Sequence, residues 1–139
     1  MTDIRYPAIL EPQEPNGFFV SFPDLEDTFT EGATQEEALR NASEVLTAML
    51  GWRVDHGHPI PTPTVGMGSA HYIAPDAKTQ AAILLRQTRE NQTLADLART
   101  METSWSAVKR LEDPHHWPSL KQLEKAAAAN GKRLVLSFE

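Results

Sequence analysis

The sequence predicts an α+β protein, in which a small antiparallel sheet carrying one helix precedes an all-α region. Apolar residues alternate along residues 4–10 and 18–22, which is the period of half-buried strands, and Asn16-Gly17 between them is a hairpin signal. In the second half, apolar residues instead recur every three or four positions, as in amphipathic helices. We therefore expect two domains, residues 1–74 and residues 75–139.

The first domain begins with three expected strands. Residues 4–10 place Ile4, Tyr6, Ala8 and Leu10 on one face, and residues 18–22 form the returning strand. Residues 23–27 are expected to form an acidic loop, and residues 28–31 a third strand that Gly32 ends.

A helix is expected to follow, because Thr34 and Glu37 have the spacing of a capping box, and to end at Gly57. Its apolar stripe, expected to lie across the sheet, is Ala38, Ala42, Val45, Met49 and Trp52, beside Leu39, Leu46 and Leu50. Residues 57–68 hold three Gly and three Pro and predict a loop. Residues 71–73 fit a short strand that returns to the sheet, which gives the order βββαβ.

The second domain is expected to open with a helix after Pro75-Asp76 that passes through Leu85 and ends near Arg89. Two short amphipathic helices follow, residues 94–101 and 105–111, joined by a tight turn with Ser104 as N-cap. A further helix starts at the capping pair Ser119 and Gln122 and ends at Asn130-Gly131. Its expected buried stripe is Leu120, Leu123, Ala126 and Ala127.

The two short helices have the shape of a helix-turn-helix, in which the second helix offers hydroxyl, indole and cationic groups to a DNA groove. The same pattern also fits two ordinary helices of a small bundle, and the indole of Trp105 also fits packing within its own domain. The candidate DNA-binding residues are Thr93, Thr103, Ser104, Trp105, Ser106, Lys109 and Arg110.

The C-terminus predicts a last strand over residues 132–139, with Leu134, Leu136 and Phe138 on one face. Because a single strand cannot satisfy its own backbone hydrogen bonds, it must pair with its copy in a homodimer or join the edge of the first sheet. The sequence leaves open whether dimers assemble into higher oligomers. The expected dimer interface is Arg133, Leu134, Val135, Leu136, Ser137 and Phe138.

Charge divides unevenly along the chain. Through Ala74 there are 3 basic and 11 acidic residues, a net charge of −8, whereas the remainder has 10 basic and 8 acidic residues, a net charge of +2. This favours partners of opposite sign for the two halves, although an acidic solvated face explains the first half equally well. The absence of cysteine excludes disulfides and thiolate metal sites. No apolar run is long enough to span a membrane and no signal-peptide pattern is present, so a cytoplasmic protein is expected.

Two families resemble the two halves. The first half resembles the HicB antitoxin domain, through Tyr6-Pro7-Ala8, residues 17–25, residues 30–38 and the Pro-rich residues 60–63. The second half resembles the XRE/Cro-type helix-turn-helix family, through Leu97-Ala98, Val108, Arg110-Leu111-Glu112 and Pro118-Ser119-Leu120. That family usually has Gly at the turn, where this chain has Glu102.

The resemblance implies a βββαβ sheet domain that neutralises a small basic HicA-like ribonuclease, and a second domain that binds operator double-stranded DNA and represses the operon. The acidic first half agrees, because a protein that cleaves RNA should be basic. The order of the strands and the helix also resembles a partial ribonuclease H-like fold. Our candidate toxin contacts are Asp24, Glu26 and Asp27.

Two alternatives remain at this stage. One is a stand-alone transcription regulator whose first domain senses a ligand. The other is a ribonuclease H-like nuclease with Asp24, Glu26 and Asp27 around a metal, which is disfavoured because catalytic carboxylates should converge from separate elements. The histidine pairs His56/His58 and His115/His116 lack a third ligand at metal spacing. We therefore expect no catalytic residues, metal or cofactor.

Overall fold

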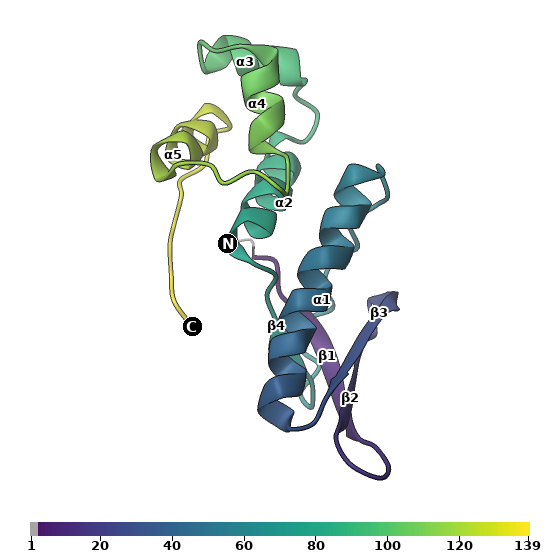
Figure 1. The fold of residues 1–139 in the computed structure, drawn as a ribbon. Helices are drawn as coiled ribbons and strands as arrows, with labels where there is room; N and C mark the ends of the chain where they lie inside the picture. The colour runs from purple at the N-terminus through teal and green to yellow at the C-terminus, as the bar shows by residue number, and fades with distance from the viewer. Residues whose placement is uncertain (1–2) are drawn as a thin grey trace. The chain divides into compact units, whose positions relative to one another are not determined.

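The computed structural model describes residues 3–139, which form a mixed α+β protein with a four-stranded antiparallel sheet and five helices. The chain divides into two compact units, of which the first ends at Ala77 and the second runs from Lys78 to Glu139 (Figure 1). None of the helices in residues 3–139 has the length and apolar character needed to cross a membrane.

The sheet of the first unit has the strand order β3-β2-β1-β4, and every neighbouring pair is antiparallel. The strands are β1 Tyr6–Pro12, β2 Phe18–Phe22, β3 Leu25–Gly32 and β4 His71–Ile73. The expected inward face of the first strand is confirmed at Ile4, Tyr6 and Ala8, which are buried. Gly17 lies in the β1–β2 turn at φ +92°, a conformation that favours glycine.

The expected acidic loop over residues 23–27 is wrong. Only Pro23 and Asp24 form the turn, and β3 already begins at Leu25, which pairs with Phe22 across an irregularity in the register. The physical reason is the burial of the Leu25 side chain, which fixes this residue against the core and leaves no room for a longer loop. Glu26 and Asp27 are therefore strand residues that project outward.

Helix α1, Gln35–Asp55, lies across one face of the sheet (Figure 1). The Oγ1 atom of Thr34 accepts a hydrogen bond from the Glu37 amide at 3.1 Å, which confirms the expected N-cap. The buried side of the helix is Ala38, Ala42, Leu46 and Leu50. The expected stripe is wrong at Trp52, which is exposed, because a residue two positions after Leu50 has turned by about 200° around the helix axis.

The loop between α1 and β4 is tied to the sheet by polar contacts. The Tyr6 hydroxyl donates to the Pro61 carbonyl, and Asp24 accepts hydrogen bonds from both the amide and the hydroxyl of Thr64, at 2.8 and 2.6 Å. The Tyr72 hydroxyl donates to the Thr64 carbonyl at 2.8 Å. The loop predicted from its Gly and Pro content is present, and these side chains give it defined anchor points.

Helix α2, Ala77–Arg89, starts at the last residue of the first unit and otherwise belongs to the second. The second unit also contains α3 Leu94–Thr100, α4 Trp105–Leu111 and α5 Leu120–Ala129. Their shared core consists of Leu85, Leu97, Ala98, Met101, Val108, Leu111 and Ala126. The expected capping box of α5 is confirmed by reciprocal hydrogen bonds between Ser119 and Gln122. Arg89 and Glu112 form a partly buried bidentate ion pair, with Nε–Oε2 at 2.6 Å, which joins α2 to the end of α4.

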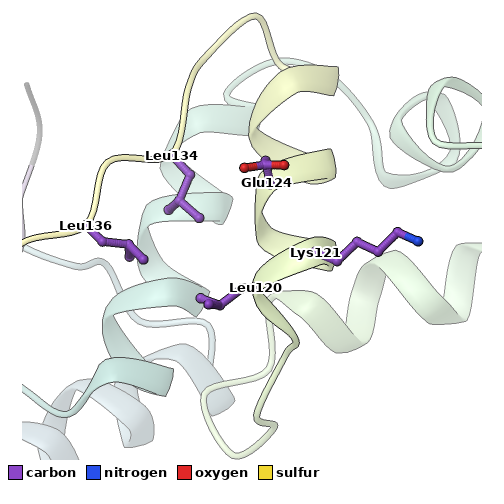
Figure 2. A pocket seen from close by; sticks show the side chains of 5 residues that line it. All are labelled: Leu120, Lys121, Glu124, Leu134 and Leu136. Atoms are coloured by element: carbon purple, nitrogen blue, oxygen red, sulfur yellow. The ribbon is translucent and has the colours of Figure 1, made fainter.

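The C-terminal segment differs from the expectation. Residues 132–139 form no strand in the single chain, and the four-stranded sheet does not include them, so within residues 3–139 the edge-pairing alternative is not observed. Within residues 3–139 no neighbouring strand pairs with this segment, and a strand requires such pairing. The expected burial of Leu120 is also wrong, since its side chain is 62% exposed. Leu120 instead lines an open pocket with Leu134 and Leu136 (Figure 2).

Gly32 provides a test of how α1 sits on the sheet. A Cβ atom at this position would lie 2.4 Å from the Ala38 amide nitrogen, so Gly32→Ala must push the helix from β3. We expect the free energy of unfolding to fall by about 1–3 kcal/mol, measured by urea denaturation of the full chain. Gly68→Ala is the matched control, because its Cβ would meet no atom within 4 Å. Equal unfolding midpoints for the two variants would contradict this packing.

Candidate functional site

Helices α3 and α4 are joined by a short, well-defined turn. Thr93 Oγ1 accepts from the Asp96 amide at 3.0 Å, and Ser104 Oγ accepts from the Ala107 amide at 3.1 Å, so each helix has a hydroxyl N-cap. Their inner faces meet through Leu97 and Val108, which are buried in the core of the second unit. Packing against α3 therefore fixes the orientation of α4 within this unit and leaves the outer face of α4 exposed to solvent.

The turn contains one residue in the left-handed region, Glu102 at φ +54°. The Thr103 amide donates to the Ala98 carbonyl at 2.9 Å, which closes the end of α3 in the manner of a Schellman motif. Glycine is the residue that this backbone favours, and Glu102 occupies the position where the resembling helix-turn-helix family has it.

All seven predicted DNA-binding residues are exposed on the second unit. On α4, the outer face lies opposite Val108 and Leu111, which are buried. It consists of Trp105, Ser106, Lys109 and Arg110. Thr93 and Ser104 use their oxygen atoms as N-caps. The hydroxyls of Ser104 and Ser106 also lie 3.2 Å apart and share a hydrogen bond in which either can donate.

The structure brings Trp105 and Lys109 together. The Lys109 ammonium lies 5.0 Å from the centre of the indole ring, a cation–π contact, and the indole is 50% exposed. Trp105 is thus not buried within its own unit, which was the alternative for this residue. An aromatic face and a cation side by side suit a polyanion that also offers bases or methyl groups.

The three predicted acidic contacts of the first unit have different surroundings. Asp24 is committed to the Thr64 amide and hydroxyl. Asp27 pairs with Arg53 of α1, with Oδ1–Nη2 at 3.3 Å. Glu26 is exposed on β3 and forms no hydrogen bond or ion pair among residues 3–139. The structure therefore does not gather the three carboxylates into one free cluster.

Tyr6 lies close to Asp24 but has a structural rather than a chemical role. Burial raises the pKa of Tyr6 to about 12; the nearby negative charge of Asp24 also raises it, and Arg53 opposes this. The phenol is therefore neutral at physiological pH and donates its proton to the Pro61 carbonyl. This hydrogen bond holds the loop, and the phenol supplies neither an acid nor a base.

One feature that the sequence prediction missed is the outer face of the sheet. The register places Glu11, Phe19 and Glu31 directly opposite one another, and Ile9, Ser21 and Phe29 in the adjacent row. The ring centres of Phe19 and Phe29 are 5.9 Å apart, and Phe29 is 57% exposed. The signal was present in the alternation of residues 18–22, of which only the inward-facing set was considered.

The C-terminal segment lies beside α5 with its apolar side chains uncovered. Leu120, Lys121, Glu124, Leu134 and Leu136 line the pocket in Figure 2. Val135, Leu136 and Phe138 are exposed, and among the predicted interface residues only Leu134 is half-buried. Several large apolar side chains are therefore exposed close together in this short segment and beside it on α5, which is a feature of interaction surfaces.

Comparison with known proteins identifies the family to which this chain belongs. Residues 5–81 match the family described as HicB_like antitoxin of bacterial toxin-antitoxin system. The chain is 33% identical to Antitoxin HicB 1 of Photorhabdus laumondii over 99% of its own length and 88% of that protein. It is 29% identical to Antitoxin HicB of Escherichia coli K12, with 96% and 98% covered, and 30% identical to Antitoxin HicB of Pseudomonas fluorescens, with 91% and 89% covered. The chain belongs to the HicB-like antitoxin family, and its role is that of an antitoxin in a toxin–antitoxin system.

Glu102 allows a test of the turn. Glu102→Gly should relieve the left-handed backbone and raise the free energy of unfolding of the second unit by about 1 kcal/mol. Ala95→Gly, at an exposed position inside α3, is the control and should lower stability by about 0.5–1 kcal/mol. Thermal unfolding of the full chain measures both; a destabilised Glu102→Gly variant would be inconsistent with φ +54° at this residue.

Proposed function

We propose that this antitoxin binds and inhibits a small basic ribonuclease of the HicA type, and that it represses its own operon by binding operator DNA as a homodimer. Family membership is the observation that carries the proposal. The first unit, with the strand and helix order β1-β2-β3-α1-β4, is proposed to be a partial ribonuclease H-like domain that contacts the toxin. The second unit is proposed to be an XRE/Cro-like helix-turn-helix domain.

Charge supports the division of labour between the units. Residues 1–74 have a net charge of −8, and a ribonuclease must attract phosphates with a basic surface. Complementary charge accelerates association and excludes partners of the wrong sign. An antitoxin that covers the RNA-binding surface of its toxin should be acidic where it binds.

The proposed inhibition of a toxin is tested with a small basic ribonuclease of the HicA type. The full-length chain should form a stable complex with this ribonuclease and abolish its cleavage of RNA. The reason is that the acidic surface of the chain would cover the basic RNA-binding surface of the ribonuclease. Size-exclusion chromatography and a labelled-RNA cleavage assay measure the two effects. A chain that neither binds that protein nor slows its RNA cleavage would contradict the antitoxin mechanism proposed here.

The proposal that the second unit binds DNA is based on the outer face of α4. Trp105, Lys109 and Arg110 are exposed on a helix whose opposite side is anchored in the core. A helix held in this way, following a short helix and a tight turn, is the arrangement that places side chains in the major groove. Thr103, Ser104 and Ser106 place hydroxyl groups near the start of α4, and Thr93 places one at the start of α3; helix starts are where phosphates are commonly bound.

Lys109→Ala and Arg110→Ala should each weaken binding to the chain's own promoter region by about 1–3 kcal/mol, because each removes a cation aimed at the groove. Fluorescence anisotropy at one fixed salt concentration measures this. Lys125→Ala, an exposed lysine on α5, is the matched control and should change the affinity little. If the double variant folds and binds DNA like the parent, the recognition-helix assignment is wrong.

The C-terminal segment is the proposed dimer interface. Residues 133–138 would pair antiparallel with their copy, which satisfies the backbone and covers Leu136 and Phe138. In the pocket on α5, Leu120 lies beside Leu134 and Leu136, so the paired strands would pack against α5 there. Dimerisation also fixes the spacing of two recognition helices, which binding to a palindromic site requires.

Deletion of residues 132–139 should convert the protein to a monomer and abolish promoter binding, while toxin inhibition persists. Multi-angle light scattering gives the mass, and the anisotropy and RNA cleavage assays give the two activities. Deletion of Glu139 alone is the control and should leave the dimer intact. A deletion variant that remains dimeric and binds the promoter normally would show that the interface lies elsewhere.

A further inference from the structure

The outer face of the sheet is open at one end. Helix α1 covers the face that carries the buried Tyr6, Ala8 and Val20, and the alternate residues point the other way. At the β4 end of this outer face, Pro7 is buried and Tyr72 is bonded to the loop through Thr64. Farther along β1, the rows through Ile9 and Glu11 are at least partly exposed, so the uncovered area lies over β1, β2 and β3.

Two chemical features meet on this open area, which we call the sheet patch: Glu11, Phe19, Phe29 and Glu31. Phe19 lies between Glu11 and Glu31 in one cross-strand row, and Phe29 occupies the next row beside it. The carboxylate of Glu31 accepts a hydrogen bond from Gln13 Nε2 at 2.9 Å, which holds it at the rim. The result is an aromatic centre flanked by carboxylates, the composition of a protein interface rather than of a solvated surface.

The negative charges of Glu11 and Glu31 limit which kind of partner can bind the sheet patch. Glu11 and Glu31 disfavour DNA, and they disfavour a second copy of this chain docked by the same patch, because like charges would face each other. A cationic protein surface fits both features: lysine or arginine can pair with the carboxylates, and the same cations can rest on the exposed ring of Phe29.

We infer that the sheet patch is the docking surface for the small basic ribonuclease, and that it contributes more to binding than the acidic residues at the β2–β3 turn. The inference rests on the proposed function of the first unit. It moves the contact from residues 24–27 to the open sheet face, because Asp24 is committed to Thr64 and Asp27 to Arg53. Among those three predicted contacts, only Glu26 lacks a bond that fixes its carboxylate within residues 3–139.

The test is a charge reversal in the full-length chain. Glu11→Lys with Glu31→Lys should weaken binding to the small basic ribonuclease of the HicA type by ~100-fold, and Phe29→Ala should weaken it by ~10-fold, as expected for the rim and centre of one interface. Isothermal titration calorimetry and the RNA cleavage assay measure these changes. Glu36→Lys with Glu44→Lys is the matched control, since both residues are exposed on α1 and the net charge changes equally. This control should bind within ~3-fold of the parent.

The outcomes separate the two levels of the proposal. If the unaltered chain does not bind the ribonuclease, the proposed function fails. If it binds and the two double variants are weakened equally, the docking surface is wrong and only bulk charge matters.

A second measurement does not depend on a folded charge-reversal variant. Phe29→p-benzoylphenylalanine should cross-link to the ribonuclease on irradiation, whereas Trp52→p-benzoylphenylalanine, at an exposed aromatic position on α1, should not. Cross-linking from position 52 alone, or from position 29 to a second copy of the chain alone, overturns the inference.

Discussion

The close packing of α1 against β3 at Gly32 and Ala38 determines what the first unit can do. Because Gly32 has no Cβ, the helix backbone approaches the strand directly, and the small side chains of Ala38 and Ala42 keep it there. A unit with a single helix can bury only one face of its sheet. The other face of the sheet is partly exposed because no second helix covers it. Its aromatic and acidic residues are therefore available to a partner.

The second unit depends on caps and a small core rather than on a long helix. Its helices α3 and α4 have seven residues each, too short to be stable alone, so Thr93 and Ser104 satisfy amides that would otherwise lack partners. The Arg89–Glu112 ion pair adds a link between helices that the apolar core does not provide. Because the caps, the core and the ion pair stabilise the unit, the outer face of α4 is not needed for folding and is available to bind a partner.

The sequence was sufficient for the elements whose signals are local. Thr34, Ser104 and Ser119 each cap the helix expected of them, and residues 71–73 pair with β1 as expected. It was insufficient where tertiary burial decides: the inward Leu25 starts β3 earlier than the acidic composition indicated, and Trp52 lies off the buried side of α1. Which carboxylates are free also depends on partners distant in sequence, as Asp24 with Thr64 shows.

The exposed apolar side chains connect these observations. Leaving a large apolar side chain in water forgoes about 1.5–3 kcal/mol of burial, so a cluster of them requires a reason in function or assembly. Phe29 lies on the open sheet face and Trp105 on the outer face of α4; Leu120, Leu136 and Phe138 lie at or beside the C-terminal pocket. Each group has a different polar setting: carboxylates around Phe29, cations around Trp105, and a C-terminal segment that lies outside the four-stranded sheet. These three settings fit the three partners that we propose for this chain: a toxin, operator DNA and a second copy of the chain.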